Sequence, residues 1–136
     1  MIISLTNTGY FCFHFFIISP FVEWFFHFIF HVPPKLKSHK NHHLEYFKNE
    51  VSIEHWPLFF VTFFYYFQCY LVCMGILKYW AVHTIIHKRP FLLPVLSEHH
   101  FYHHKNPDKN YAVSAVFPDK ILGTFEKNVK VKKKWI

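Results

Sequence analysis

Long apolar segments alternate with short polar ones along this chain. Residues 10–31 and 56–82 are rich in aromatic and branched apolar side chains, whereas residues 35–55 and those from 83 onward are polar and mixed in charge. An apolar run of about 20 residues makes a helix of roughly 30 Å, which is enough to cross the hydrocarbon core of a bilayer. We therefore expect an all-α, integral membrane protein with a membrane helix at about residues 10–31.

The distribution of charge agrees with this expectation. The formal net charge is +7 with histidine neutral, yet residues 1–34 contain no Lys or Arg. Positive charge gathered between and after apolar segments is typical of loops on the cytosolic face of a membrane, so we expect a membrane and no nucleic acid as partner. A cleaved signal peptide is disfavoured, because Pro20 and Glu23 interrupt the first apolar run and no basic residue precedes it.

Histidines supply the candidate chemistry. Ten of the 13 histidines fall into four clusters, in which the spacings H-x-x-x-H and H-x-x-H-H alternate. Both spacings place rings on one face of a helix. Crowding such rings beside apolar segments costs desolvation and mutual repulsion, unless a bound divalent metal holds them neutral. Ten ligands are too many for one ion, so we predict two adjacent metals bound by His27, His31, His39, His42, His43, His83, His87, His100, His103 and His104.

These histidines form two sets of five, one within residues 27–43 and one within residues 83–104, and an apolar region separates them. A single membrane crossing by residues 56–82 would put the sets on opposite faces, and two full crossings would need about 40 residues. We therefore expect a short membrane hairpin at about residues 56–82, which reverses near Tyr66 to Tyr70. Such a hairpin brings both sets to one face, and the basic flanks mark that face as cytosolic.

Other polar residues receive smaller roles. His99 is expected either as an eleventh ligand or as a hydrogen-bond partner of a ligand. His14 has no partner at helical spacing and is interpreted as a packing or hydrogen-bonding residue, and the isolated His55 is given no role in the metal site. Ser97 is expected to cap a helix over residues 98–104. Cys12, Cys69 and Cys73 lie in apolar runs and are interpreted as reduced thiols without chemistry.

The C-terminal region, residues 83–136, is expected to be cytosolic. Residues 106–125 are turn-rich and then apolar, and we expect them to fold back over the histidines. The chain ends Lys133-Lys134-Trp135-Ile136, which resembles the dilysine signal that returns membrane proteins to the endoplasmic reticulum. The alternative is a basic tail attracted to anionic lipid.

The order H-x-x-x-H, H-x-x-H-H, H-x-x-x-H, H-x-x-H-H, with an apolar stretch between the halves, resembles the fatty acid hydroxylase and sterol desaturase superfamily of membrane di-iron oxygenases. After the last cluster, Phe117-Pro118-Asp119 stands where that family usually has Leu-Trp-Asp. Leu122-Gly123-Thr124 likewise stands for Phe-Gly-Thr. The resemblance covers roughly residues 22–125, although the chain is about half the usual length of the family.

The resemblance implies that residues 1–136 form one fatty acid hydroxylase-like membrane domain. Two irons bound by the ten histidines would use O2 as co-substrate to hydroxylate or desaturate a lipid. Electrons would come from an external donor such as cytochrome b5 or a ferredoxin, and the protein would reside in the endoplasmic reticulum of a eukaryote. Fatty acyl hydroxylation is favoured over oxidation of a sterol or a carotenoid.

Two other function classes stay open on the sequence alone. Because imidazole suits zinc as well as iron, the protein could be a metal carrier without redox chemistry, and isolated protein could carry zinc in either case. A third interpretation is a family-like protein that acts only as a structural partner. The regular spacing of all four clusters argues against this interpretation.

Overall fold

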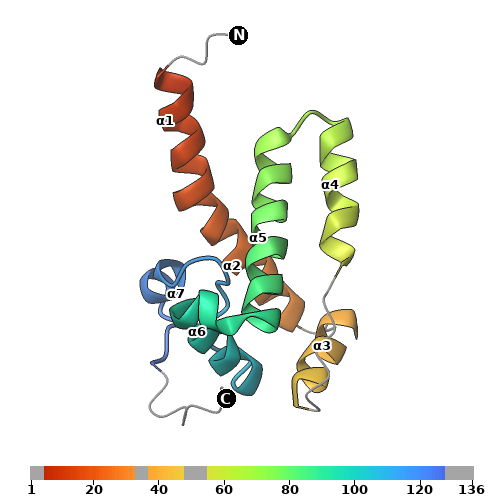
Figure 1. Ribbon diagram of the computed structural model, residues 1–136, viewed down its shortest axis with the longest axis vertical. Helices are drawn as coiled ribbons and strands as arrows, with labels where there is room; N and C mark the ends of the chain where they lie inside the picture. Colours follow the sequence, from red (N-terminus) through yellow and green to blue (C-terminus); the bar gives the residue numbers. More distant parts are fainter. Residues whose placement is uncertain (1–4, 33–36, 48–54, 128–136) are drawn as a thin grey trace.

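The computed structural model describes residues 5–32, 37–47 and 55–127 (Figure 1), and within these ranges every element is a helix, as predicted. The lysine signal at the C-terminus lies outside these residues. The elements in chain order are α1 (Leu5–Phe13), the π-helix η1 (His14–Ile18), α2 (Ser19–His31), α3 (Lys37–Phe47), α4 (Trp56–Tyr66), α5 (Tyr70–Lys88), the 3₁₀ helix η2 (Pro90–Leu92), α6 (Pro94–Lys105) and α7 (Phe117–Leu122).

The first three elements follow one another without a break. Within the ranges described, the segment Thr8–His31 is the one helix of 18 or more residues that is long and apolar enough to cross a membrane. Most of its apolar side chains lie on the surface of the molecule, and Phe13, Phe16 and Phe25 are each more than half exposed. The predicted helix at residues 10–31 is therefore present.

Pro20 explains the irregular turn in this helix. The Ser19 N–H donates to the His14 carbonyl, five residues back, in place of the usual four. In this register the Phe15 carbonyl faces Pro20, which has no N–H to donate. Lys78 of α5 donates to that carbonyl instead, with Nζ 2.8 Å from the oxygen. The proline thus creates an acceptor that ties the first helix to α5.

Helices α4 and α5 form an antiparallel hairpin (Figure 1) whose reversal lies at residues 67–69, within the region where the sequence placed it. The turn is a Schellman motif, in which Cys69 N–H donates to the Phe64 carbonyl and Gln68 N–H to the Tyr65 carbonyl, both at 2.9 Å. Gln68 adopts the left-handed conformation, with φ 59°, that glycine usually supplies. A turn without Gly or Pro is achieved at the cost of this one strained residue.

Helices α3, α6 and α7 gather at the end of the molecule away from the hairpin turn and the start of α1 (Figure 1). A small core of Ile86, Phe101 and Val113 fixes α5, α6 and the following loop to one another. The prediction that Ser97 caps α6 is wrong. The helix begins one turn earlier, at Pro94, because proline at the first helical position needs no partner for an N–H. The Ser97 hydroxyl donates to the Pro90 carbonyl at 3.0 Å.

Candidate metal centre

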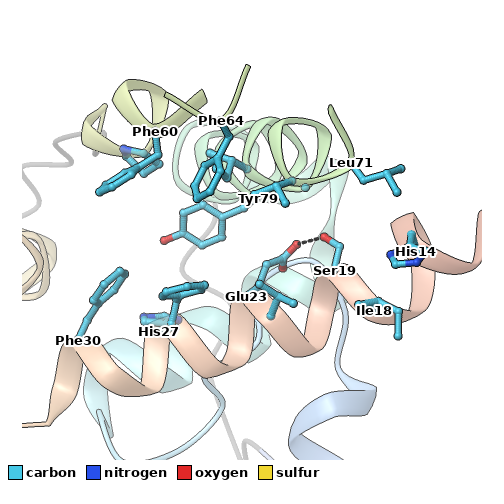
Figure 2. Close-up of a pocket in the computed structure, with 16 residues that line it drawn as sticks. His14, Ile18, Ser19, Glu23, His27, Phe30, Phe60, Phe64, Leu71 and Tyr79 are labelled. Carbon is cyan, nitrogen blue, oxygen red and sulfur yellow. Dashed lines mark hydrogen bonds between the residues drawn. The ribbon is translucent and has the colours of Figure 1, made fainter. Parts of the chain in front are cut away.

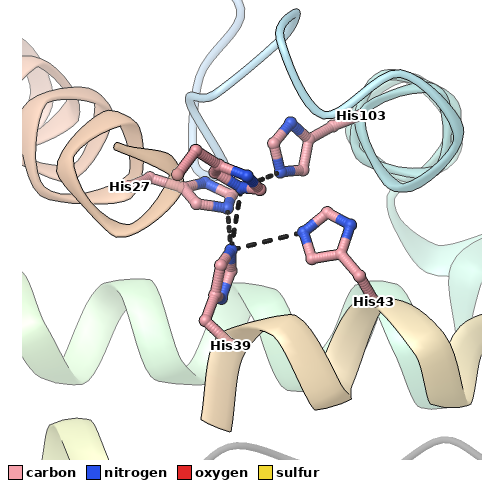
Figure 3. A group of neighbouring side chains, drawn as sticks. His27, His39, His43 and His103 are labelled. Atoms are coloured by element: carbon pink, nitrogen blue, oxygen red, sulfur yellow. Dashed lines mark hydrogen bonds between the residues drawn. The ribbon is translucent and has the colours of Figure 1, made fainter. Parts of the chain in front are cut away.

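The structure brings the ten predicted histidines together in two groups of five. Within each group the ligand nitrogens all lie within 4.8 Å of one another, and such groups could hold metal ions. Figure 3 shows rings of the first group converging from α2, α3 and α6. The first group is His27, His31, His39, His43 and His103, and the second group is His42, His83, His87, His100 and His104.

This division differs from the two sets of five that the sequence suggested. His103 belongs to the first group although it follows the hairpin, and His42 belongs to the second group although it precedes it. Neighbouring residues on a helix point about 100° apart. His42 and His43 on α3 therefore face different groups, as do His103 and His104 on α6. Each group takes four ligands from one half of the chain and one from the other.

Backbone carbonyls fix the tautomer of two ligands in the first group. His27 donates from Nδ1 to the Tyr111 carbonyl, and His103 donates from Nδ1 to the Lys109 carbonyl at 2.7 Å. A neutral ring that carries its proton on Nδ1 presents only a lone pair at Nε2. The loop at residues 109–111 thus orients both Nε2 atoms as metal ligands.

The spacing of the Nε2 atoms fits ligands that share an ion. Nε2 of His27 and His31 each lie 3.0 Å from Nε2 of His39, and Nε2 of His31 lies 3.1 Å from that of His103. In the second group, Nε2 of His83 and His104 each lie 3.0 Å from Nε2 of His100. Two nitrogens about 2.1 Å from one ion lie about 3.0 Å apart when they subtend a right angle. Five imidazole nitrogens at this spacing form a suitable donor set for a divalent transition metal.

Burial keeps these rings neutral. His100 and His103 have no exposed surface, and His104 is 1% exposed. Burial, followed by the neighbouring imidazoles, lowers the pKa of all three well below the ordinary 6.5. The same two causes lower the pKa of His43, on α3, to about 2. At neutral pH these four rings are therefore in the form that binds metal, without first losing a proton.

Asp119 on α7 has a structural role near the ligands that the sequence did not reveal. Its fully buried carboxylate accepts hydrogen bonds from the backbone N–H groups of Tyr111 and Ala112, at 2.8 and 2.9 Å. It also accepts from Trp24 Nε1 and Thr124 Oγ1, at 2.9 and 2.6 Å. Asp119 therefore anchors the loop whose carbonyls orient His27 and His103. The resemblance to a family motif marked this aspartate in the sequence, but not its partners.

The remaining histidines lie outside the two groups. His99, expected as an eleventh ligand or as a partner of one, points its Nε2 at Asp119 Oδ2, 2.9 Å away. It thus contacts the residue that anchors the loop rather than either cluster of ligands. His14 lines a pocket described below, and the exposed His55 lies beside Trp80, with 6.0 Å between ring centroids.

An apolar pocket of about 350 Å³ runs between α2 and the α4–α5 hairpin (Figure 2). His27 of the first group lines one end, together with Phe30 and Tyr79. Tyr79 also stacks on His83 of the second group, with ring centroids 5.4 Å apart. The pocket therefore reaches the first group directly through His27, and Tyr79 separates it from the second group. Its volume falls in the range of small-molecule sites.

Two charged side chains meet beside this pocket. In the sequence, each is the one Asp, Glu, Lys or Arg residue of its apolar segment. Glu23 of α2 forms an ion pair with Lys78 of α5, with Oε1 3.3 Å from Nζ. Ionisable residues inside apolar segments are costly and are expected to pair. The two residues could have been matched from the sequence on that ground.

Comparison with protein-family models, with curated proteins and with solved structures gives no match for this chain.

Proposed function

We propose that this protein is a membrane-bound oxidoreductase that uses two histidine-bound metals to oxidise the apolar chain of a lipid. One observation carries the proposal: of two neighbouring groups of five imidazoles, the first contributes His27 to one end of an apolar pocket, and the second lies behind Tyr79 of the same pocket. A metal store has no need of an apolar slot beside its ligands, whereas an enzyme that acts on a hydrocarbon chain needs both.

Contacts between the groups favour two ions that act together. His43 of the first group lies 4.4 Å from His104 of the second, measured between ring centroids. His42 of the second group and His43 of the first are consecutive residues of α3, and their ring centroids lie 6.2 Å apart. Rings in contact place their ions near enough to share one substrate molecule.

Iron is the proposed element and O2 the proposed co-substrate. When bound, two irons would supply the oxidation of an unactivated C–H bond, which no side chain of this protein can perform. The protein's own part is to hold the ligands neutral, to orient them through residues 109–111, and to present the chain from the pocket. Electrons would come from an external carrier such as cytochrome b5 or a ferredoxin.

The membrane assignment rests on the exposed apolar surface. Phe16 of the first helix is 60% exposed, and Phe59 and Tyr66 of α4 are 75% and 81% exposed. Apolar exposure on this scale, spread over both the first helix and α4, is typical of contact with a membrane or a partner. We propose that the bilayer surrounds Thr8–His31 and the hairpin, with the metal centre on the cytosolic face of the endoplasmic reticulum. A fatty acyl chain would then enter the pocket from the bilayer, and a sterol or a carotenoid is the alternative substrate.

The test combines metal analysis with lipid profiling. The full chain is expressed with and without His103→Ala, purified in detergent and analysed for metal, while lipids of the expressing cells are profiled. We expect iron in the wild-type protein, and hydroxylated or desaturated lipids that are absent with His103→Ala. Stoichiometric zinc together with unchanged lipids would contradict the oxygenase and favour a metal carrier.

A further inference from the structure

The pocket is not uniformly apolar. In the first turns of α2, Ser19 and Glu23 line it near Ile18, Val22 and Phe26. Figure 2 shows the Ser19 hydroxyl and the Glu23 carboxylate side by side in the wall that faces the hairpin. Oγ of Ser19 donates to Oε1 of Glu23 at 3.3 Å. Glu23 itself is 8% exposed. A hydroxyl and a carboxylate therefore occupy the wall of a cavity that otherwise suits a hydrocarbon chain.

The protein holds this carboxylate with donors from three segments. Oε1 accepts from the Ser114 hydroxyl at 2.8 Å and pairs with Lys78 Nζ at 3.3 Å, while Oε2 accepts from the Ser114 N–H at 3.1 Å. The charge of Glu23 is thus balanced by Lys78. A carboxylate has about four acceptor positions, and a hydroxyl that donates still has two lone pairs. Three donors already engage Oε1, so the acceptor capacity that remains belongs to Oε2, which accepts one hydrogen bond, and to the Ser19 hydroxyl oxygen.

Gly75 of α5 keeps space next to the hydroxyl. A Cβ at this position would lie 3.2 Å from Ser19 Oγ, closer than an ordinary contact, and Gly75 also lines the pocket. Any larger residue would press on the hydroxyl from the opposite wall. The glycine therefore allows α5 to approach α2 while Ser19 stays beside the cavity.

Building on the function proposed above, we propose that Ser19 and Glu23 recognise an uncharged hydrogen-bond donor on the lipid, a hydroxyl or an amide N–H. The pair presents acceptors, so a free carboxylate, which has no hydrogen to donate, would find no partner there and would be disfavoured. Glu23 precedes His27 by one helical turn, about 6 Å along the axis. The carbon presented to the metal ligands would therefore lie a few bonds from the recognised group.

Direct binding tests this inference without requiring turnover. Tritiated 1-octadecanol is bound to the detergent-purified full chain in a scintillation proximity assay, and unlabelled 1-octadecanol, octadecane and octadecanoate compete. One hydrogen bond to a charged acceptor corresponds to about tenfold or more in affinity. We expect the alcohol to compete at least tenfold better than the alkane or the acid.

Variants assign the preference to the pair. Ser19→Ala and Glu23→Gln should each reduce the preference for alcohol over alkane severalfold, with octadecane itself competing as in wild type. Ser97→Ala, which removes a buried hydroxyl outside the pocket, should leave the preference unchanged. Equal competition by alcohol and alkane, stronger competition by the acid, or no binding of the alcohol would overturn the proposal. Because the assay needs neither O2 nor electrons, alcohol binding without lipid oxidation would reject only the enzymatic function.

Discussion

Asp119 offers the sharpest test of how the loop supports the metal ligands. In Asp119→Asn the side chain keeps one acceptor oxygen but gains an NH2 group in place of the other. If the oxygen stays near Trp24 and Thr124, the NH2 group faces the Ala112 N–H and His99 Nε2, which now bond Oδ2 at 2.9 Å each. Two hydrogen bonds to a charged acceptor are lost, and each is worth about 1.5 kcal/mol or more.

The expected loss of stability is therefore about 3 kcal/mol, which corresponds to a fall in apparent Tm of about 10 °C for a chain of this size. The displaced loop also carries the Tyr111 carbonyl that orients His27, so the first group should bind metal more weakly. Thermal unfolding and metal content are measured in detergent, with Asp108→Asn at an exposed position of the same loop region as the matched control. An Asp119→Asn protein with wild-type Tm and full metal content would refute this account of the loop.

Three further predictions concern the ion pair, the pocket and acid pH. Lys78→Met should destabilise the protein by about 3 kcal/mol, because it leaves the buried Glu23 carboxylate without its cation, and adding Glu23→Gln should restore part of the loss. A double-mutant cycle by thermal unfolding measures this, and additive losses would contradict the pairing. Gly75→Val should abolish lipid oxidation with metal content unchanged, because the side chain enters the pocket against Ser19. Oxidation at the wild-type rate would contradict the role of the pocket. His43 should make the protein less stable in acid. Its pKa is about 2 when folded and near 6.5 when unfolded, so below pH 6.5 the unfolded state binds the proton first and stability falls toward pH 2. Thermal unfolding between pH 8 and pH 5 checks this, and a Tm that rises on acidification would contradict the sign.

The helices follow from the sequence because they rest on local pattern, and the convergence of the histidines follows from the expectation that both sets build one site. Apolar length predicts the helix at residues 10–31, and the need to bring two sets of histidines together predicts the hairpin, even though its turn relies on Gln68 rather than glycine. H-x-x-x-H spacing places His83 and His87 on one face of α5, and they share one group. Local periodicity suffices for features of this kind.

Features that depend on tertiary docking did not follow from the sequence. His42 and His43 point in different directions from α3, and only the placement of α3 against α6 decides which group each one joins. Asp119 gains its role from Trp24, 95 residues away in the chain. At the start of α6, both Pro94 and Ser97 are helix-start signals, and the fold uses the proline.

The exchange of His42 and His103 between the groups is the central claim about the site, and metal stoichiometry in double variants tests it most directly. Full-length protein is purified in detergent, dialysed against a weak chelator and analysed for metal per chain. We expect two ions in wild type and one in His103→Ala. We also expect one ion in His103→Ala combined with His27→Ala, since both belong to the first group, and none in His103→Ala combined with His83→Ala. One ion in the His83 combination and none in the His27 combination would contradict the structure and restore a division between the two halves of the chain.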